Sequence, residues 1–234
     1  MKTIILHYHL FKNAGTSIDA LLKRNFEDKW VTKEFKVTND NSDEIRAWIE
    51  ENPKAIVFSS HTMTGSIPKI EGVNIISIIM LRNPTRRIIS AYKFERNQQA
   101  DTWGANLAKQ ASFEDYVVTR LKKHGDTQCR NFQTGRLASM NLTQASRAER
   151  AINALDDFSI VGVVEDFNKS LKLLEFTLKK CFPDFKAQSN HSNRSNESEL
   201  ELSPALSQLL YECNKDDNQV WKAGIDKLKK LNID

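Results

Sequence analysis

The sequence predicts an α/β fold with a central, mainly parallel sheet flanked by helices, and three observations favour this class. Short apolar segments alternate with amphipathic, helix-like segments along most of the chain. The run 73–81 is apolar on both faces, as is typical of a strand in the middle of a parallel sheet. The 234 residues are 40% hydrophobic and contain neither a repeat nor an obvious linker, so we expect one domain spanning residues 1–234.

The predicted strands and helices alternate along the chain. Strands are expected over residues 3–11, 55–59, 73–81 and 159–164. Helices are expected over residues 16–26, 42–51, 113–123, 144–155 and 169–181, and amphipathic helical structure over residues 203–231. A further helix should begin at Asn83 and Pro84, because asparagine is a preferred cap and proline is tolerated at the first helical position. Ser42 is expected to cap the helix that it begins, and the polar stretch 187–199 is expected to form a loop.

The composition narrows the possible classes of protein. With 34 basic and 30 acidic residues the net charge is +4, a mild bias that tolerates an anionic ligand without proving one. The three cysteines are widely spaced and form no CxxC pair, so we expect neither a disulfide framework nor a zinc site. The most apolar run, 75–81, is far shorter than the roughly 18 residues that cross a bilayer. The N-terminus lacks the pattern of a signal peptide, so a cytoplasmic location is expected.

A first candidate anion site is the segment LFKNAGTS, residues 10–17, between the first predicted strand and its helix. Open α/β sheets bind ligands at this position, because the helix N-terminus offers unpaired N–H groups and partial positive charge. A lysine, an amide, two small residues and two hydroxyls suit a terminal phosphate or sulfate, and these are Lys12, Asn13, Ala14, Gly15, Thr16 and Ser17. The order differs from the GxxxxGK[ST] loop, since the lysine precedes the only glycine. An ordinary strand-to-helix turn with a solvated lysine is the alternative interpretation.

A second candidate anion site is the segment LRNPTRRIISAY, residues 81–92. Arg82 should leave the carboxyl end of a strand, at the same edge of the sheet as Lys12. Ser90 should lie about two turns into the following helix, where its hydroxyl and the guanidinium could bind one phosphate. The alternative interpretation is that Arg82 forms a salt bridge that caps the helix and that Ser90 is a packing residue.

These two segments resemble the cofactor-binding motifs of the PAPS-dependent sulfotransferases. HLFKNAGTS (9–17) is similar to the HxPKxxGTS-type loop that binds the 5′-phosphosulfate in that family, and LRNPTRRIISAY to the LRxPxxRxxSxY segment that binds the 3′-phosphate. Weaker similarity continues in NFQTGRL (131–137) and IVGVVEDFNKSL (160–171). The resemblance is strongest to the carbohydrate (2-O-type) sulfotransferases and their bacterial relatives. Two departures stand out, because Phe11 replaces a usual proline and Asn13 a common threonine.

The resemblance implies a P-loop-like three-layer fold and a reaction. The reaction would move a sulfuryl group from PAPS to an acceptor hydroxyl, expected on a glycan, and would release PAP without a metal. Lys12 would act in catalysis and, with residues 13–17, bind the 5′ end of the cofactor, while Arg82 and Ser90 would bind its 3′-phosphate.

His61 is the candidate base. It should end the second predicted strand at the carboxyl edge, and its placement is similar to that of the histidine assigned as the base in the carbohydrate branch. Histidine is also the side chain best matched to proton transfer near neutral pH. His7 and His9 share one face of the first strand and are expected to be buried and hydrogen-bonded. His191 has no assigned role, and Glu165 is expected to have a surface or a structural role.

Three other functions compete with sulfuryl transfer. A P-loop-like nucleotide kinase would require ATP and magnesium, and a non-catalytic module would bind PAP without transferring anything. Nucleic-acid binding would use the basic residues Arg86, Arg87, Lys93 and Arg96, but no aromatic platform accompanies them, so no nucleic-acid partner is expected. The acceptor would be contacted by variable segments, for which 97–112 and the polar stretch 187–199 are candidates.

Overall fold

The computed structural model describes residues 1–36, 38–188 and 200–231, and a five-stranded sheet runs through its centre. The strands are β1 (Lys2–Tyr8), β2 (Trp30–Thr32), β3 (Val57–Ser60), β4 (Val73–Leu81) and β5 (Ile160–Val163). Their spatial order is β2-β3-β1-β4-β5, and each of these four pairings is parallel. The predicted α/β class is therefore confirmed. Strands β2 and β3 lie on one side of β1, and β4 and β5 lie on the other. The order in which successive strands are added to the sheet therefore reverses beside β1, and open α/β sheets bind ligands at such a point.

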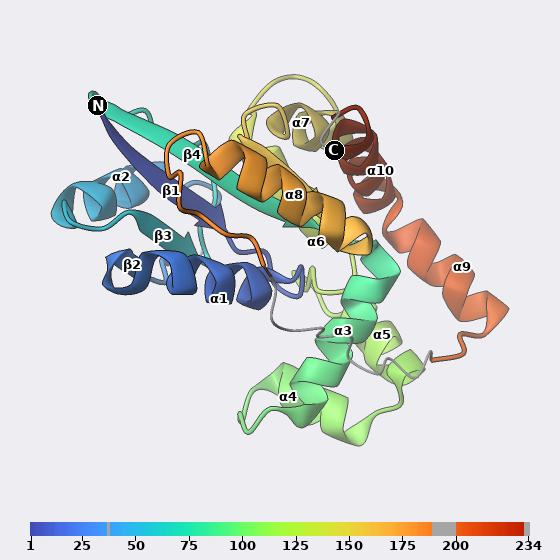
Figure 1. Ribbon diagram of the computed structural model, residues 1–234. Coiled ribbons are helices and arrows are strands. Elements are labelled where there is room, and N and C mark those ends of the chain that lie inside the picture. Colours follow the sequence, from blue (N-terminus) through green and yellow to red (C-terminus); the bar gives the residue numbers. More distant parts are fainter. Residues whose placement is uncertain (37, 189–199, 232–234) are drawn as a thin grey trace.

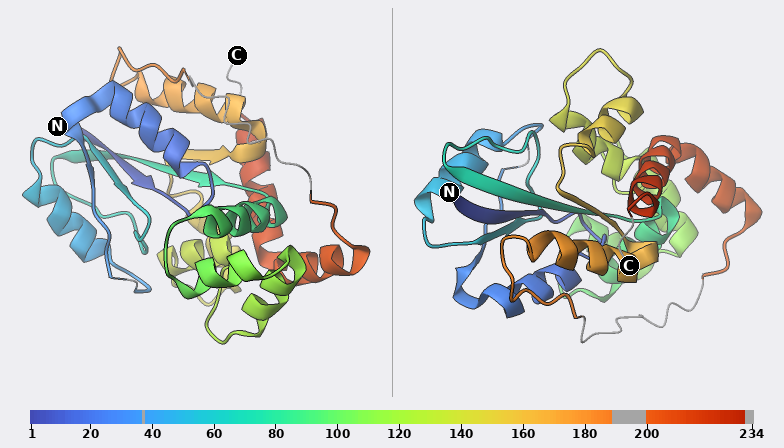
Figure 2. Two further views of the ribbon diagram at one scale, coloured as in Figure 1. Left: turned by 90° about the horizontal axis from the view of Figure 1, so that it is seen from below. Right: turned by 45° about the horizontal axis from the view of Figure 1, so that its top comes forward.

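Helices cover both faces of the sheet, which gives the three layers seen in Figures 1 and 2. One face is covered by α1 (Gly15–Phe26) and α8 (Phe167–Leu178). The other is covered by α2 (Ser42–Glu51), α6 (Phe132–Leu137) and α7 (Arg147–Ala154). The helix α10 (Lys215–Lys229) packs at the β5 edge and contributes to both layers. Successive side chains of a strand point to opposite faces, so Ile5 and Leu6 are both fully buried but in different layers.

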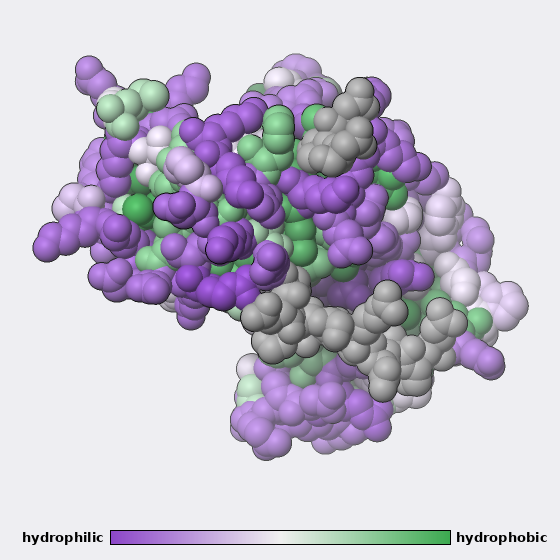
Figure 3. Space-filling model, viewed as in Figure 1, coloured by the Kyte–Doolittle hydropathy of each residue, from purple (hydrophilic) through white to green (hydrophobic). Residues whose placement is uncertain are grey.

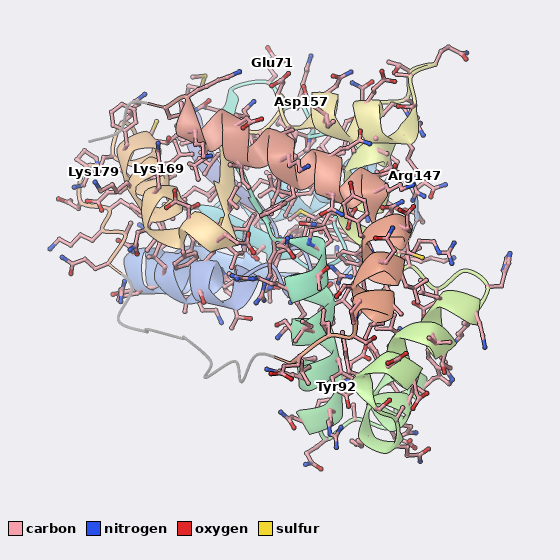
Figure 4. All side chains as sticks on the ribbon, turned by 90° about the vertical axis from the view of Figure 1, so that its right-hand side faces the viewer. Glu71, Tyr92, Arg147, Asp157, Lys169 and Lys179 are labelled. Atoms are coloured by element: carbon pink, nitrogen blue, oxygen red, sulfur yellow. The ribbon has the colours of Figure 1, made fainter. Side chains whose placement is uncertain are left out.

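The helices that contribute a third apolar cluster lie beyond the carboxyl edge of the sheet (Figure 1). These helices are α3 (Pro84–Asn97), α4 (Trp103–Gln110), α5 (Phe113–Lys122) and α9 (Pro204–Cys213). Tyr92, labelled on α3 in Figure 4, packs edge-on against Phe113 with the ring centroids 5.3 Å apart. Its hydroxyl donates to the Ala111 backbone oxygen at 2.9 Å, so α3 is fixed to the helices beside it.

The surface of the molecule is mainly polar on the face shown in Figure 3, where apolar side chains are visible only in patches between the helices. No helix within the described ranges is long and apolar enough to cross a membrane. Short 3₁₀ turns complete the regular structure and are η1 (Glu27–Lys29), η2 (Ala138–Met140) and η3 (Val164–Asp166).

Most of the predicted elements are confirmed, although the ends of several differ by one to three residues from the predicted ones. Two differences have a clear local reason. The first strand ends at Tyr8 rather than at residue 11, because the chain turns there and the Asn13 N–H donates to the Leu10 oxygen at 3.2 Å. The prediction that Ser42 caps its helix is wrong, because Asn41 is the capping residue and the Ser42 N–H donates to a side-chain oxygen of Asp40.

The remaining differences concern segments in which the hydrophobic pattern of the sequence did not indicate the individual elements. The helical stretch 203–231 is two helices, α9 and α10, which meet at the buried Asn214, whose amide donates to the backbone oxygens of Leu210 and Cys129. The sequence did not predict β2, α4 or α6, and α4 occupies part of the stretch 97–112. The polar stretch 187–199, including His191, lies outside the described residues from position 189 onward.

Candidate active site

A cavity of about 930 Å³ opens at the carboxyl edge of the sheet. It is lined by the loop after β1, the end of β3, one side of α3 and the start of the turn after β5. Eight of the nine predicted site residues line it, namely Lys12, Ala14, Gly15, Thr16, Ser17, His61, Arg82 and Ser90. The two candidate anion sites and the candidate base therefore belong to one cavity.

The loop after β1 has a backbone shaped for an anion. Lys12 and Ala14 both adopt the left-handed conformation, with φ of 64° and 60°. The hydrogen bonds of α1 begin with the Ser17 N–H, which donates to the Ala14 oxygen at 3.0 Å. The N–H groups of Gly15 and Thr16 therefore have no acceptor within the helix and stand at its positive end. Such a turn of consecutive N–H groups forms a concave site for a phosphate or sulfate.

The Lys12 ammonium packs over the ring of Phe94, with Nζ 4.5 Å from the ring centroid. Phe11 meets the same ring edge-on, with the centroids 5.5 Å apart, so the residue that replaces the usual proline supports this wall of the cavity. Partial burial and the neighbouring Arg82 guanidinium lower the pKa of Lys12 from its ordinary value. A bound anion would relieve the repulsion between these two cations.

Asn13 is the one predicted site residue that does not line the cavity. Its side chain is fully buried and donates to the Met80 backbone oxygen and to Gln133 Oε1, both at 2.7 Å. Gln133 in turn accepts from the Arg82 N–H at 3.0 Å and donates to the Arg82 oxygen at 2.8 Å. Asn13 and Gln133 therefore fasten the loop after β1 to the end of β4 from behind, which helps to hold its left-handed residues in place.

Arg82 links the two candidate anion sites directly, because its Nη1 donates to the Lys12 backbone oxygen at 3.1 Å. Ser90 lies on the side of α3 that borders the cavity, together with Arg86, Lys93, Phe94 and Asn97. The prediction of a cap at Asn83 is confirmed, since its side-chain oxygen accepts from the Arg86 N–H at 3.1 Å. Glu165 accepts from the Asn83 N–H at 3.0 Å, which joins the start of α3 to the turn after β5.

His61 directly follows β3, and its ring is oriented by a carboxylate. Nδ1 lies 2.8 Å from Glu34 Oε1, and Glu34 Oε2 accepts from the Thr62 hydroxyl at 2.9 Å. An ionised carboxylate can only accept, so the proton resides on Nδ1, and Nε2 of the neutral ring is left as an acceptor. Burial raises the pKa of Glu34, but the hydrogen bonds from His61 and Thr62 lower it by more, which keeps this carboxylate ionised.

Glu34 was not identified from the sequence. It follows β2, a three-residue strand with too few residues to show a pattern, and it lies 27 residues before His61. Only the parallel pairing of β2 with β3 brings the ends of these two segments together.

His7 and His9 are buried and hydrogen-bonded, as predicted. Both donate from Nδ1 to Asp19 on α1, His7 to Oδ1 at 2.8 Å and His9 to Oδ2 at 2.9 Å, and the Ser59 hydroxyl donates to Oδ1 at 2.6 Å. Burial raises the pKa of Asp19, but the hydrogen bonds from the two histidines lower it by more, to well below its ordinary range. His9 also lines the cavity, and its ring centroid is 3.8 Å from that of His61.

The ligand atoms of His7, His9 and Asp19 lie within 4.8 Å of one another, a spacing that could hold a metal ion, and within the described part of the chain this is the one such group. The hydrogen bonds between these residues already satisfy both carboxylate oxygens and both Nδ1 atoms. The three residues form a buried polar network, in which His7 Nε2 is buried without a hydrogen-bond partner among the described residues.

A parallel sheet with a tight loop between its central strand and the following helix defines an α/β protein of the P-loop-like class. Residues 2–222 match the Sulfotransferase family. An uncharacterized protein of Archaeoglobus fulgidus is similar to this chain, with 34% identity over an alignment of 249 residues in length that covers 97% of this chain and 98% of that protein. The chain therefore belongs to the sulfotransferase family, and the resemblance seen in its motifs is confirmed at the level of the family.

Proposed function

We propose that this sulfotransferase moves a sulfuryl group from PAPS to a hydroxyl of a carbohydrate acceptor and releases PAP. The observation that carries the proposal is the meeting of Lys12 and Arg82 in one cavity, where they are joined by a hydrogen bond of 3.1 Å. A ligand with anionic groups at both ends could contact both side chains, and PAPS is such a ligand. The carbohydrate acceptor rests on the resemblance of both motifs to the carbohydrate branch of the family.

Two groups of residues would bind the nucleotide. Lys12 and the backbone of residues 14–17 would bind the 5′-phosphosulfate, and Arg82 with Ser90 would bind the 3′-phosphate. Asn13 would hold the loop without touching the ligand, because its amide is already committed to Met80 and Gln133. Binding at the remote 3′-phosphate would position the reacting end.

The reaction would be an in-line displacement at sulfur. The bond from sulfur to the acceptor oxygen forms as the bond from sulfur to the phosphate oxygen breaks, and His61 Nε2 takes the proton of the acceptor hydroxyl. By analogy with phosphoryl transfer, the transition state is loose, with negative charge developing on the leaving phosphate. Lys12 and the N–H groups of the loop would stabilise that charge, because Lys12 and residues 14–17 line the cavity.

The test is transfer of radiolabelled sulfate from PAPS to a panel of neutral and acidic glycans, with the PAP that is released measured in the same reaction. We expect labelled glycan and PAP in equal amounts, and we expect His61→Ala to lose roughly 10²- to 10⁴-fold in turnover. Turnover of ATP with magnesium would favour a kinase instead. PAP binding without transfer to any acceptor would favour a binding module.

The single domain, the cytoplasmic location and the absence of a nucleic-acid partner remain predictions from the sequence.

A further inference from the structure

We propose that His9 is a second catalytic imidazole of this site and that its Nε2–H donates a hydrogen bond to the sulfuryl group during transfer. This inference rests on the proposed reaction with PAPS. It differs from the role expected from the sequence, in which His9 is a buried structural residue.

The position of the His9 ring points to this contact. The side chain is only 5% exposed, and the part that is accessible lines the cavity. A Cβ atom added to Gly15 would lie 1.9 Å from Cδ2 and 2.2 Å from Nε2 of His9. The Nε2 edge of the ring is therefore pressed against the backbone of the loop whose N–H groups would bind the 5′-phosphosulfate. The glycine is required here because any side chain would occupy the space of the ring.

The orientation of the ring leaves Nε2 for a ligand. Nδ1 lies 2.9 Å from Asp19 Oδ2, and that carboxylate is fixed by His7 and Ser59 through its other oxygen. Because the carboxylate only accepts, His9 keeps a proton on Nδ1, and a second proton on Nε2 makes the ring a donor toward the cavity. Asp19 is 15% exposed and its pKa is lowered, so its carboxylate would stabilise a second proton on the His9 ring across a short distance.

The His9 ring packs against the ring of His61, the proposed base. The two ring centroids are 3.8 Å apart, and each ring has its own carboxylate, Glu34 for His61 and Asp19 for His9. In the proposed reaction His9 donates from Nε2 to the sulfuryl oxygens, and His61 Nε2 accepts the proton of the acceptor hydroxyl. The two rings therefore have different roles in one step.

The experiment compares the affinities of PAPS and PAP, because these ligands differ by the sulfuryl group alone. Titration calorimetry without acceptor should show that His9→Asn weakens PAPS binding by roughly 10- to 100-fold, the range of a hydrogen bond to a charged group, and leaves PAP binding unchanged. His9→Gln should recover part of the preference for PAPS, because its amide nitrogen can reach the position of Nε2. Lys12→Ala should weaken both ligands.

His7→Asn is the matched control, since His7 shares Asp19 with His9 but is fully buried and does not line the cavity. It should lower Tm without changing the ratio of the two affinities. Equal weakening of PAPS and PAP by His9→Asn, or no change in either, would overturn the proposal for His9 while leaving the reaction in place. Failure of the unmodified protein to bind either ligand would instead overturn the proposed function.

Discussion

Arg82 donates a hydrogen bond from Nη1 to the backbone oxygen of Lys12, 70 residues earlier in the chain, at 3.1 Å. These residues follow β4 and β1, which are neighbours in the sheet, so the parallel pairing delivers both side chains to the same edge. The contact also fixes the distance between the loop that would bind one end of a nucleotide and the helix α3 that would bind the other. The proposed function depends on this spacing.

The pairing of Glu34 with His61 leads to a first prediction. Glu34→Ala should lower kcat by about tenfold, because the ring would lose the partner that orients it and keeps the proton on Nδ1. Glu34→Gln should be milder, since its amide oxygen can still accept from Nδ1. Steady-state kinetics with PAPS and a glycan acceptor would measure both. Glu44→Ala, an exposed change on α2, is the control, and an unchanged kcat in Glu34→Ala would show that the pairing has no role in turnover.

The contact between Gly15 and His9 leads to a second prediction. Gly15→Ala should lower stability by about 1–3 kcal/mol and weaken PAP binding, because the new Cβ meets a ring that Asp19 prevents from moving. Gly135→Ala is the matched control, since its Cβ would meet only the far end of the exposed Arg147 side chain, 2.8 Å from Nη2. Thermal unfolding and calorimetry with PAP would measure the two effects. Equal behaviour of the two alanine variants would contradict the close packing described for this loop.

The buried Asp19 network predicts a specific dependence of stability on pH. The pKa of Asp19 is lower in the folded protein than in the unfolded chain, so its contribution to stability is fully present above the unfolded value of about 3.9 and is lost as the pH falls below it. Asp19→Asn should therefore lower Tm by several degrees at about pH 5, and the difference from the unmodified protein should shrink as the pH approaches about 2. Asp43→Asn, an exposed change on α2, should show no such trend. A constant difference across this range would mean that the Asp19 charge contributes little.

The sequence predicts the parts of this molecule that depend on local pattern. The run of β4 was predicted with its observed ends, and the Asn83 cap with proline behind it marks the start of α3. The loop containing Lys12 could be recognised because its residues are consecutive. Parallel strands then bring separate segments to one edge, so a cavity shared by Lys12, His61 and Arg82 follows from the fold class.

The parts that could not be predicted depend on contacts between segments that are distant in the chain. The sequence predicted that the Asn13 amide contacts the ligand. In the structure the amide instead donates to Gln133, 120 residues later, and so holds the loop in place. Glu34 gives no signal of its own, because an exposed glutamate in a loop is common. The role of Asp19 on α1 also appears only once His7, His9 and Ser59 surround it.

The most direct test of the central claim is calorimetric binding of PAP to the unmodified protein, to Lys12→Ala and to Arg82→Ala. ATP plus magnesium is the competing ligand. The control variant is Lys172→Ala, on the surface of α8. We predict that the unmodified protein binds PAP in preference to ATP, with about 2.7 kcal/mol of added stability when PAP is present at 100 times its Kd. Each of the two cavity substitutions should weaken PAP binding by about tenfold or more, and the control should not. Preference for ATP with magnesium, or PAP binding that survives the loss of Arg82, would contradict the claim that one nucleotide spans both sites.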